Sequence, residues 1–207
     1  MATLDQIQAA MTGFPRTLTW PNFRDVQTSP EPPSTAHTYA TWSLSGWTAH
    51  LAHGVYRVHG ARMTVALGHN GTWATQAARS STDLLQHEQG HFDITGLIAR
   101  DLISKVLDLS IDQPVVAAMR GAGHTAHSHR QYAAGFFQTE IDQFIQDANS
   151  IMNRLQTSPV THSDGLYDVQ TNHSQNAAGQ QAWNERLQRI KVTNQSFELS
   201  LRIEGLI

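Results

Sequence analysis

The chain has no cysteine among its 207 residues, so disulfide bonds and thiolate metal sites are excluded. Any bound metal ion must therefore take histidine nitrogens and carboxylate oxygens as its protein ligands. Charge is also scarce, because Asp, Glu, Lys and Arg make up only 15% of the residues and the formal net charge is −3. This balance gives no sign of a nucleic-acid partner or of an anionic membrane surface as a partner.

Long hydrophobic runs are missing as well. No stretch approaches the roughly 18 apolar residues of a membrane span, and the N-terminus lacks the basic and then apolar pattern of a signal peptide. We therefore expect a soluble chain without a membrane span, and its compartment stays open, a secreted or periplasmic location included. The chain shows no repeat and no long linker, which predicts one domain over residues 1–207, with residues 1–17 as an N-terminal helical extension.

Short runs of β-branched and aromatic residues, separated by glycines, fill the segment from residue 38 to about residue 77. Such runs predict antiparallel strands or hairpins. The Pro/Ser/Thr-rich segment 28–37 predicts a loop instead, and the alternating segment 196–203 predicts a final strand.

A helical period of 3.6 residues begins near Ser81 or Thr82, and a second long helix is predicted from about Gln131 to Gln156. A loop is expected over residues 121–130, a polar irregular stretch up to about residue 177, and then a short helix. The predicted fold class is α+β, with an antiparallel or mixed sheet packed on the two long helices.

Twelve histidines are present, and most are scattered singly, as ordinary surface or core-edge histidines are. Two of them stand four residues apart in the stretch HEQGH, as His87 and His91, with Glu88 beside the first. On a helix these two imidazoles lie on one face and can converge on one cation. Gly90 and Gly96 each cost this helix about 1 kcal/mol relative to alanine, so we expect another element to approach closely there.

The motif supports a specific chemistry. Two neutral imidazoles bind Zn²⁺ well and leave room for a third protein ligand and a water molecule. The metal lowers the pKa of that water and polarises a substrate carbonyl. Glu88 is then the expected general base, which takes the water's proton and passes it to the leaving amine.

The third ligand is not fixed by the motif. The longer pattern His-Glu-x-x-His-x-x-Gly-x-x-His is absent, because Ile94 and Leu97 occupy its later positions. Glu140 on the second helix is one candidate, although a solvated or paired carboxylate is the simpler interpretation. A further group could bind a metal or form an exposed turn: His124, His127 and His129.

A downstream stretch, YDVQTNH at 167–173, is followed by Gln180 and Trp183. Together with HEQGHFDIT it resembles a bacterial family of predicted zinc-dependent proteases that is catalogued as domain of unknown function 922. Two weaker similarities lie upstream, in LTWPNF at 18–23 and GTWA at 71–74. The resemblance thus extends from about residue 18 to residue 190.

The resemblance implies a zincin-like fold, peptidase activity and one Zn²⁺ per chain. It matches His87 and His91 to metal ligands and Glu88 to the catalytic glutamate, and it implies His173 as the third ligand. Ser174 departs from the family, which usually has glycine there.

The predicted function is therefore a zinc metallopeptidase that acts on a peptide or protein substrate. Two alternatives remain, a zinc-stabilised binding module without turnover and a zinc hydrolase of a non-peptide amide. Asp93 is either a hydrogen-bond acceptor for a ligand imidazole or part of an ion pair. Tyr167 is either a donor to the oxyanion of the reaction or a packing residue.

Overall fold

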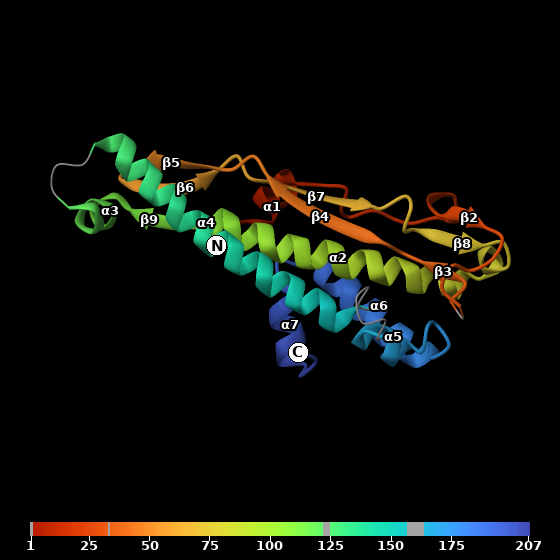
Figure 1. Ribbon diagram of the computed structural model, residues 1–207. Helices are drawn as coiled ribbons and strands as arrows, with labels where there is room; N and C mark the ends of the chain where they lie inside the picture. Colours follow the sequence, from red (N-terminus) through yellow and green to blue (C-terminus); the bar gives the residue numbers. More distant parts are fainter. Residues whose placement is uncertain (1, 33, 122–124, 157–163) are drawn as a thin grey trace.

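A computed structural model describes residues 2–32, 34–121, 125–156 and 164–207. Two long helices, α2 (Thr82–Asp108) and α4 (Ala126–Leu155), lie side by side, with strands along one side of α2 and the helices nearest the C-terminus along the other (Figure 1). The shorter helices are α1 (Leu4–Ala10), α3 (Gln113–Arg120), α5 (Leu166–Thr171), α6 (Ala177–Lys191) and α7 (Phe197–Ile203). The predicted α+β class with two long helices is confirmed.

The strands of the described residues form three sheets of three strands each, in the orders β1-β7-β4, β2-β8-β3 and β5-β6-β9. Two pairs, β1 with β7 and β2 with β8, are parallel, so the first two sheets are mixed, whereas the third is antiparallel. The strands are β1 (Met11–Thr12), β2 (Arg24–Val26), β3 (Ala36–His37), β4 (Ala40–Ser45), β5 (Thr48–Ala52), β6 (Val55–His59), β7 (Arg62–Leu67), β8 (Trp73–Thr75) and β9 (Ser110–Asp112).

The hairpins predicted between residues 38 and 77 are present as one nested ribbon, in which β4 pairs with β7 and β5 pairs with β6. The ribbon turns at His53 and Gly54, which both have positive φ, 51° and 77°. This is the requirement of the two-residue type I′ turn that matches the twist of paired strands. Halfway along the ribbon, Gly46 and Gly60 face each other, and a Cβ on Gly60 would lie 2.9 Å from the carbonyl oxygen of Gly46.

Helix α2 is the centre of the core. Ser81 caps it by accepting a hydrogen bond from the amide of Leu84 at 3.1 Å, so the helix begins where its period predicted. Strands, α1, α4, α6 and α7 all contact this helix, so almost every side chain from His87 to Ile103 is buried. At Gly96 the ring of Phe14 occupies the space of a side chain, which confirms the close approach expected there.

The predicted strand at 196–203 is wrong, because this segment forms α7. Ser196 caps the helix, accepting from the amide of Leu199 at 3.2 Å, and the apolar residues Phe197 and Leu201 are buried at a helical spacing of four. Asp101 of α2 accepts hydrogen bonds from the Ser196 hydroxyl and the Glu198 amide, both at 2.8 Å. A tertiary contact and a cap thus outweigh an alternating pattern of only eight residues.

Two other boundaries differ from the expectation. Helix α4 already begins at Ala126, within the predicted loop, because Thr125 accepts a hydrogen bond from the amide of Ser128 at 3.3 Å. Helix α5 lies within the stretch predicted to be irregular. No helix in the described parts of the chain is both long and apolar enough to cross a membrane.

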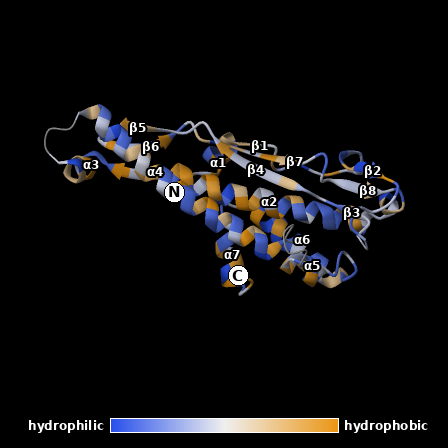
Figure 2. Cartoon of the chain, viewed as in Figure 1, coloured by the Kyte–Doolittle hydropathy of each residue, from blue (hydrophilic) through white to orange (hydrophobic). Residues whose placement is uncertain are grey.

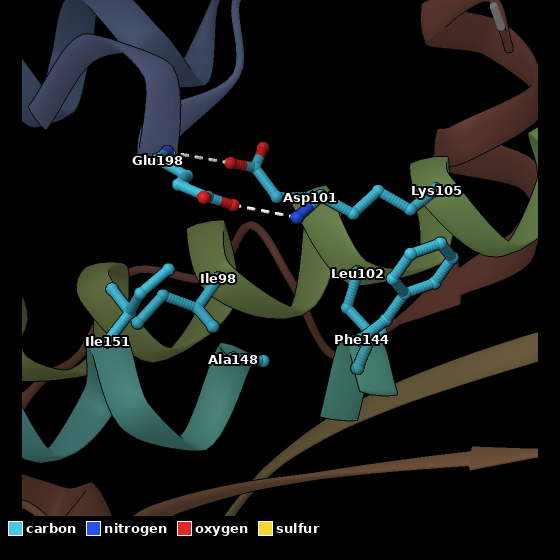
Figure 3. A pocket seen from close by; sticks show the side chains of 8 residues that line it. All are labelled: Ile98, Asp101, Leu102, Lys105, Phe144, Ala148, Ile151 and Glu198. Carbon is cyan, nitrogen blue, oxygen red and sulfur yellow. Dashed lines mark hydrogen bonds and ion pairs between the residues drawn. The ribbon is translucent and has the colours of Figure 1, made fainter. Parts of the chain in front are cut away.

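A small hollow lies between α2, α4 and α7 (Figure 3). Its walls are held by an ion pair between Lys105 and Glu198 at 2.7 Å, and the Lys105 ammonium also lies 5.6 Å from the centre of the Phe144 ring. The hollow has a volume of about 10 Å³, which is room for one water molecule. The hollow is therefore too small for a ligand. The contacts around it hold α7 against the two long helices.

Arg100 fixes the loop between α6 and α7. Its guanidinium donates to the carbonyl oxygens of Ile190 at 2.7 Å, Thr193 at 3.1 Å and Gln195 at 2.6 Å. Burial lowers the pKa of Arg100, and the neighbouring Asp101 partly opposes this shift. A side chain of α2 thus pairs with one carbonyl of the last turn of α6 and with two carbonyls of the loop that follows it.

We predict that Arg100→Met lowers the free energy of unfolding by about 3 kcal/mol, because three hydrogen bonds from a largely buried guanidinium are lost. Urea unfolding measures the change. The matched control is Arg202→Met on α7, whose exposed ion pair with Glu198 is worth about 0.5 kcal/mol. Equal losses in the two variants would contradict the role given to Arg100.

Candidate metal centre

The N-terminal part of α2 is polar and yet buried. In Figure 2 this part is largely blue, whereas the middle of the helix carries more hydrophobic residues. The exposed fractions of His87, Glu88, His91 and Asp93 are only 2%, 3%, 9% and 3%. Buried polar groups cost free energy unless they are paired, so this concentration needs partners.

Helix α5 supplies a further polar side chain, which lies against the two histidines. The Oδ1 atom of Asp168 lies 3.2 Å from Nε2 of His87 and 3.1 Å from Nε2 of His91, and the two Nε2 atoms are 3.2 Å apart. Among the described residues, these three form the group whose ligand atoms all lie within 4.8 Å of one another. The predicted pair His87 and His91 is thus brought together, with Asp168 beside it.

The size of this triangle suits a metal ion. Ligand atoms at about 2.0–2.1 Å from a tetrahedral Zn²⁺ are separated by about 3.3 Å, close to the three distances of the group. The donor set is also chemically suitable, because two imidazoles and one carboxylate are common ligands of divalent cations. His87, His91 and Asp168 could therefore hold a metal ion.

The electrostatics of the group favour positive charge. Burial by itself lowers the pKa of His91, but the adjacent Asp168 carboxylate, with a smaller contribution from Glu88, raises it above the ordinary value of a histidine. Negative charge therefore outweighs burial at this imidazole, and the same field attracts a cation.

Glu88 lies next to this group and is itself buried. Its negative charge acts on both His91 and Tyr167. Its Oε2 atom has no hydrogen-bond partner among the residues that the structure describes. A buried carboxylate oxygen without a partner is costly, and such atoms are found where a ligand, a water molecule or a reaction uses them.

His173 lies at the edge of the group. Its side chain is 47% exposed, its Nε2 atom pairs with Asp164 at 3.3 Å, and its Nδ1 atom is 3.7 Å from Oδ1 of Asp168. The ring meets that of His87 edge-on, with 6.2 Å between the ring centres. His173 is therefore a neighbour of the group, and its assignment as a metal ligand stays a prediction.

The backbone that carries His173 is unusual. Asn172, His173 and Ser174 all have positive φ, at 46°, 50° and 75°. Each such residue costs roughly 1 kcal/mol when it is not glycine. Ser174 has the largest φ of the three.

Asp168 was missed by sequence reasoning as a ligand. It is the second residue of the Tyr-Asp-x-x-Thr-x-His stretch that carried the resemblance. Its place in that stretch was the feature of the sequence that could have identified it. The other candidates lie elsewhere: Glu140, His127 and His129 are on α4 and outside the group, and His124 lies outside the described residues.

The two alternatives for Asp93 and Tyr167 can be compared with the contacts. Asp93 forms an ion pair with Lys191 at 2.8 Å and accepts a hydrogen bond from Gln89 at 3.0 Å. Burial raises the pKa of Asp93, and Lys191 partly opposes the shift. Tyr167 is fully buried, donates to the backbone carbonyl of His87 at 3.0 Å and packs edge-on against Trp183. These contacts favour the ion pair and the packing residue.

The close approach expected at Gly90 is confirmed, because the hydroxyl of Tyr167 occupies the space of a Cβ there. Only a glycine at this position lets α5 come near enough to place Asp168 beside the histidines. The prediction of a zincin-like fold and the family resemblance have no independent support from relatives, since comparison with family models, curated proteins and solved structures gives no match.

We predict that Gly90→Ala lowers the free energy of unfolding by about 2 kcal/mol, because the methyl group displaces Tyr167. Helix propensity alone would give a gain of about 1 kcal/mol. The control is Gly135→Ala on α4, where a Cβ meets no atom within 4 Å, and which should show that gain. Urea unfolding measures the free energy of unfolding of both variants. Stabilisation by Gly90→Ala would contradict the packing described.

Proposed function

We propose that this chain is a zinc-dependent metallopeptidase whose metal is held by His87, His91 and Asp168. The observation that carries the proposal is the triangle of ligand atoms, 3.1–3.2 Å on each side, next to the buried carboxylate of Glu88. When bound, the metal would lower the pKa of a water molecule and polarise the substrate carbonyl.

Zinc is the metal that suits this set best. No thiolate is present, and the two imidazoles favour zinc over the oxygen-seeking magnesium and calcium ions. Three protein ligands also leave one position open, as in catalytic sites, whereas structural zinc sites are closed by four.

Glu88 supplies the proton transfers. A general base must hold a free lone pair close to the water it activates, and the unpartnered Oε2 atom of Glu88 meets this need. The carboxylate accepts the proton of the attacking water and then gives it to the leaving amine. A binding module that keeps zinc only for stability has no use for such a group.

The choice of a peptide substrate and of a zincin-like fold rests on the resemblance described above. The resemblance also assigns His173 as the third ligand, whereas the distances favour Asp168. In our proposal His173 lies at the edge of the site, paired with Asp164. The two assignments make different predictions for metal binding.

We predict that the protein binds about one Zn²⁺ per chain and that Asp168→Ala weakens this binding more than His173→Ala does, because Asp168 provides a ligand atom. Titration against a competing chelator measures the affinity, and the thermal midpoint should rise with added zinc. A larger loss in His173→Ala would make His173 the third ligand. Wild-type protein that binds no zinc would overturn the proposal.

We predict that Glu88→Gln keeps the fold and the zinc but lowers peptide hydrolysis by at least about 10²-fold, because an amide cannot accept the proton. Turnover is measured on any peptide that the zinc-loaded wild type cleaves. Glu185→Gln, an exposed position on α6, is the control and should keep full activity. Equal turnover of wild type and Glu88→Gln would show that Glu88 is not the base.

A further inference from the structure

Both ring nitrogens of His87 have close polar neighbours. Nε2 faces Asp168 and His91, while Nδ1 lies 3.2 Å from Oε1 of Gln180 and 3.2 Å from Oγ1 of Thr171. A neutral imidazole carries hydrogen on only one nitrogen, and only the other one can bind a metal. The neighbours of Nδ1 therefore decide whether Nε2 is available as a ligand.

The contact with Tyr167 fixes the orientation of the Gln180 side-chain amide. The Tyr167 hydroxyl has one hydrogen, which it donates to the His87 carbonyl at 3.0 Å, so towards other groups it can only accept. The Nε2 atom of Gln180 lies 2.9 Å from that hydroxyl and 3.0 Å from Oδ1 of Asn184, and it donates to both. The amide of Gln180 is thus oriented with its carbonyl oxygen towards His87.

Thr171 is restricted in the same way. Its hydroxyl hydrogen goes to the carbonyl oxygen of Tyr167, the shortest contact it makes, at 2.7 Å. It can then offer only a lone pair to His87. Two acceptors therefore face Nδ1 of His87, and a hydrogen on this nitrogen serves both. At the other end of the ring, His91 can donate its own Nε2 hydrogen to Asp168 at 3.1 Å or to Nε2 of His87 at 3.2 Å, so Nε2 of His87 need not carry one.

We infer that Gln180 and Thr171, oriented by Tyr167, hold His87 in the Nδ1–H tautomer and so present its Nε2 lone pair to the metal before any metal binds. Gln180 is 4% exposed, and Thr171 and Tyr167 are fully buried, so water does not compete for these hydrogen bonds. The Tyr167 ring also stacks on the His87 ring, 4.9 Å away and inclined by 10°, which fixes the plane of the imidazole.

Helix α6 is the support of this arrangement. The Trp183 indole, three residues after Gln180, donates to Oε1 of Gln170 on α5 at 2.8 Å and meets the Tyr167 ring at 5.4 Å between ring centres. Gln180 and Thr171 are thus positioning residues, which act on the metal through His87. Their value to catalysis rests on the proposed function, but the tautomer itself does not.

The first experiment records long-range ¹H–¹⁵N spectra of the histidine rings in metal-free protein at about pH 8.5, well above the ordinary pKa of histidine. The His87 signals are assigned with a His87→Asn variant. We expect a protonated Nδ1 and an unprotonated Nε2 in the wild type. An Nε2–H tautomer at His87 would overturn the inference, whatever the activity of the enzyme.

The second experiment compares Gln180→Leu with Gln181→Leu, its exposed neighbour on the same helix. We expect Gln180→Leu to populate the Nε2–H tautomer and to weaken zinc binding about 10–100-fold, as loss of such a hydrogen bond does. The control should change neither. Gln180→Glu keeps an acceptor for Nδ1–H and should restore the tautomer and part of the zinc affinity.

Unchanged tautomer and zinc affinity in Gln180→Leu would overturn the role of Gln180. If that variant does not fold, the nearly isosteric Thr171→Val removes the other acceptor that faces Nδ1, and its tautomer is compared with that of the wild type. An Nε2–H tautomer in the wild type overturns the inference in either case. A protein with the expected tautomer and zinc affinity but without hydrolysis would leave this inference standing and would remove only the proposed peptidase function.

Discussion

Two imidazole nitrogens and one carboxylate oxygen meet within 3.2 Å in the interior of this protein. Lone pairs held so close together, away from water, repel each other unless a proton or a metal ion lies between them. The other features of the site follow from this convergence. Gly90 admits α5, which brings Asp168, and α6 brings the amide that orients His87.

The free-energy cost of burying these polar groups is offset by the apolar packing of the rest of α2. From Ile94 onward the helix is buried among strands and helices on most of its sides, and this apolar half anchors the polar half. Arg100 and Asp101 bind the end of α6 and the start of α7 to α2. The three consecutive residues with positive φ after α5 add strain at the edge of the site, where strained backbone is often found in enzymes.

Local patterns predicted the parts of this structure that depend on local physics. The helical period placed His87 and His91 on a buried face, and the glycines at 90 and 96 indicated close contacts that the structure contains. Asp168 could not be identified in this way, because its role depends on α5 folding back over α2, with Asp168 77 positions after His91 (168 − 91). The segment 196–203 was misassigned because its helical state depends on Asp101, a residue far away in the sequence.

The central claim is that His87, His91 and Asp168 bind one zinc ion. The most direct test is a crystal structure of the zinc-loaded protein with anomalous data collected at the zinc absorption edge. The account predicts one strong peak per chain, about 2.0–2.2 Å from Nε2 of His87, Nε2 of His91 and a carboxylate oxygen of Asp168. A structure in which these three side chains bind no ion, or in which the zinc lies elsewhere, would contradict it.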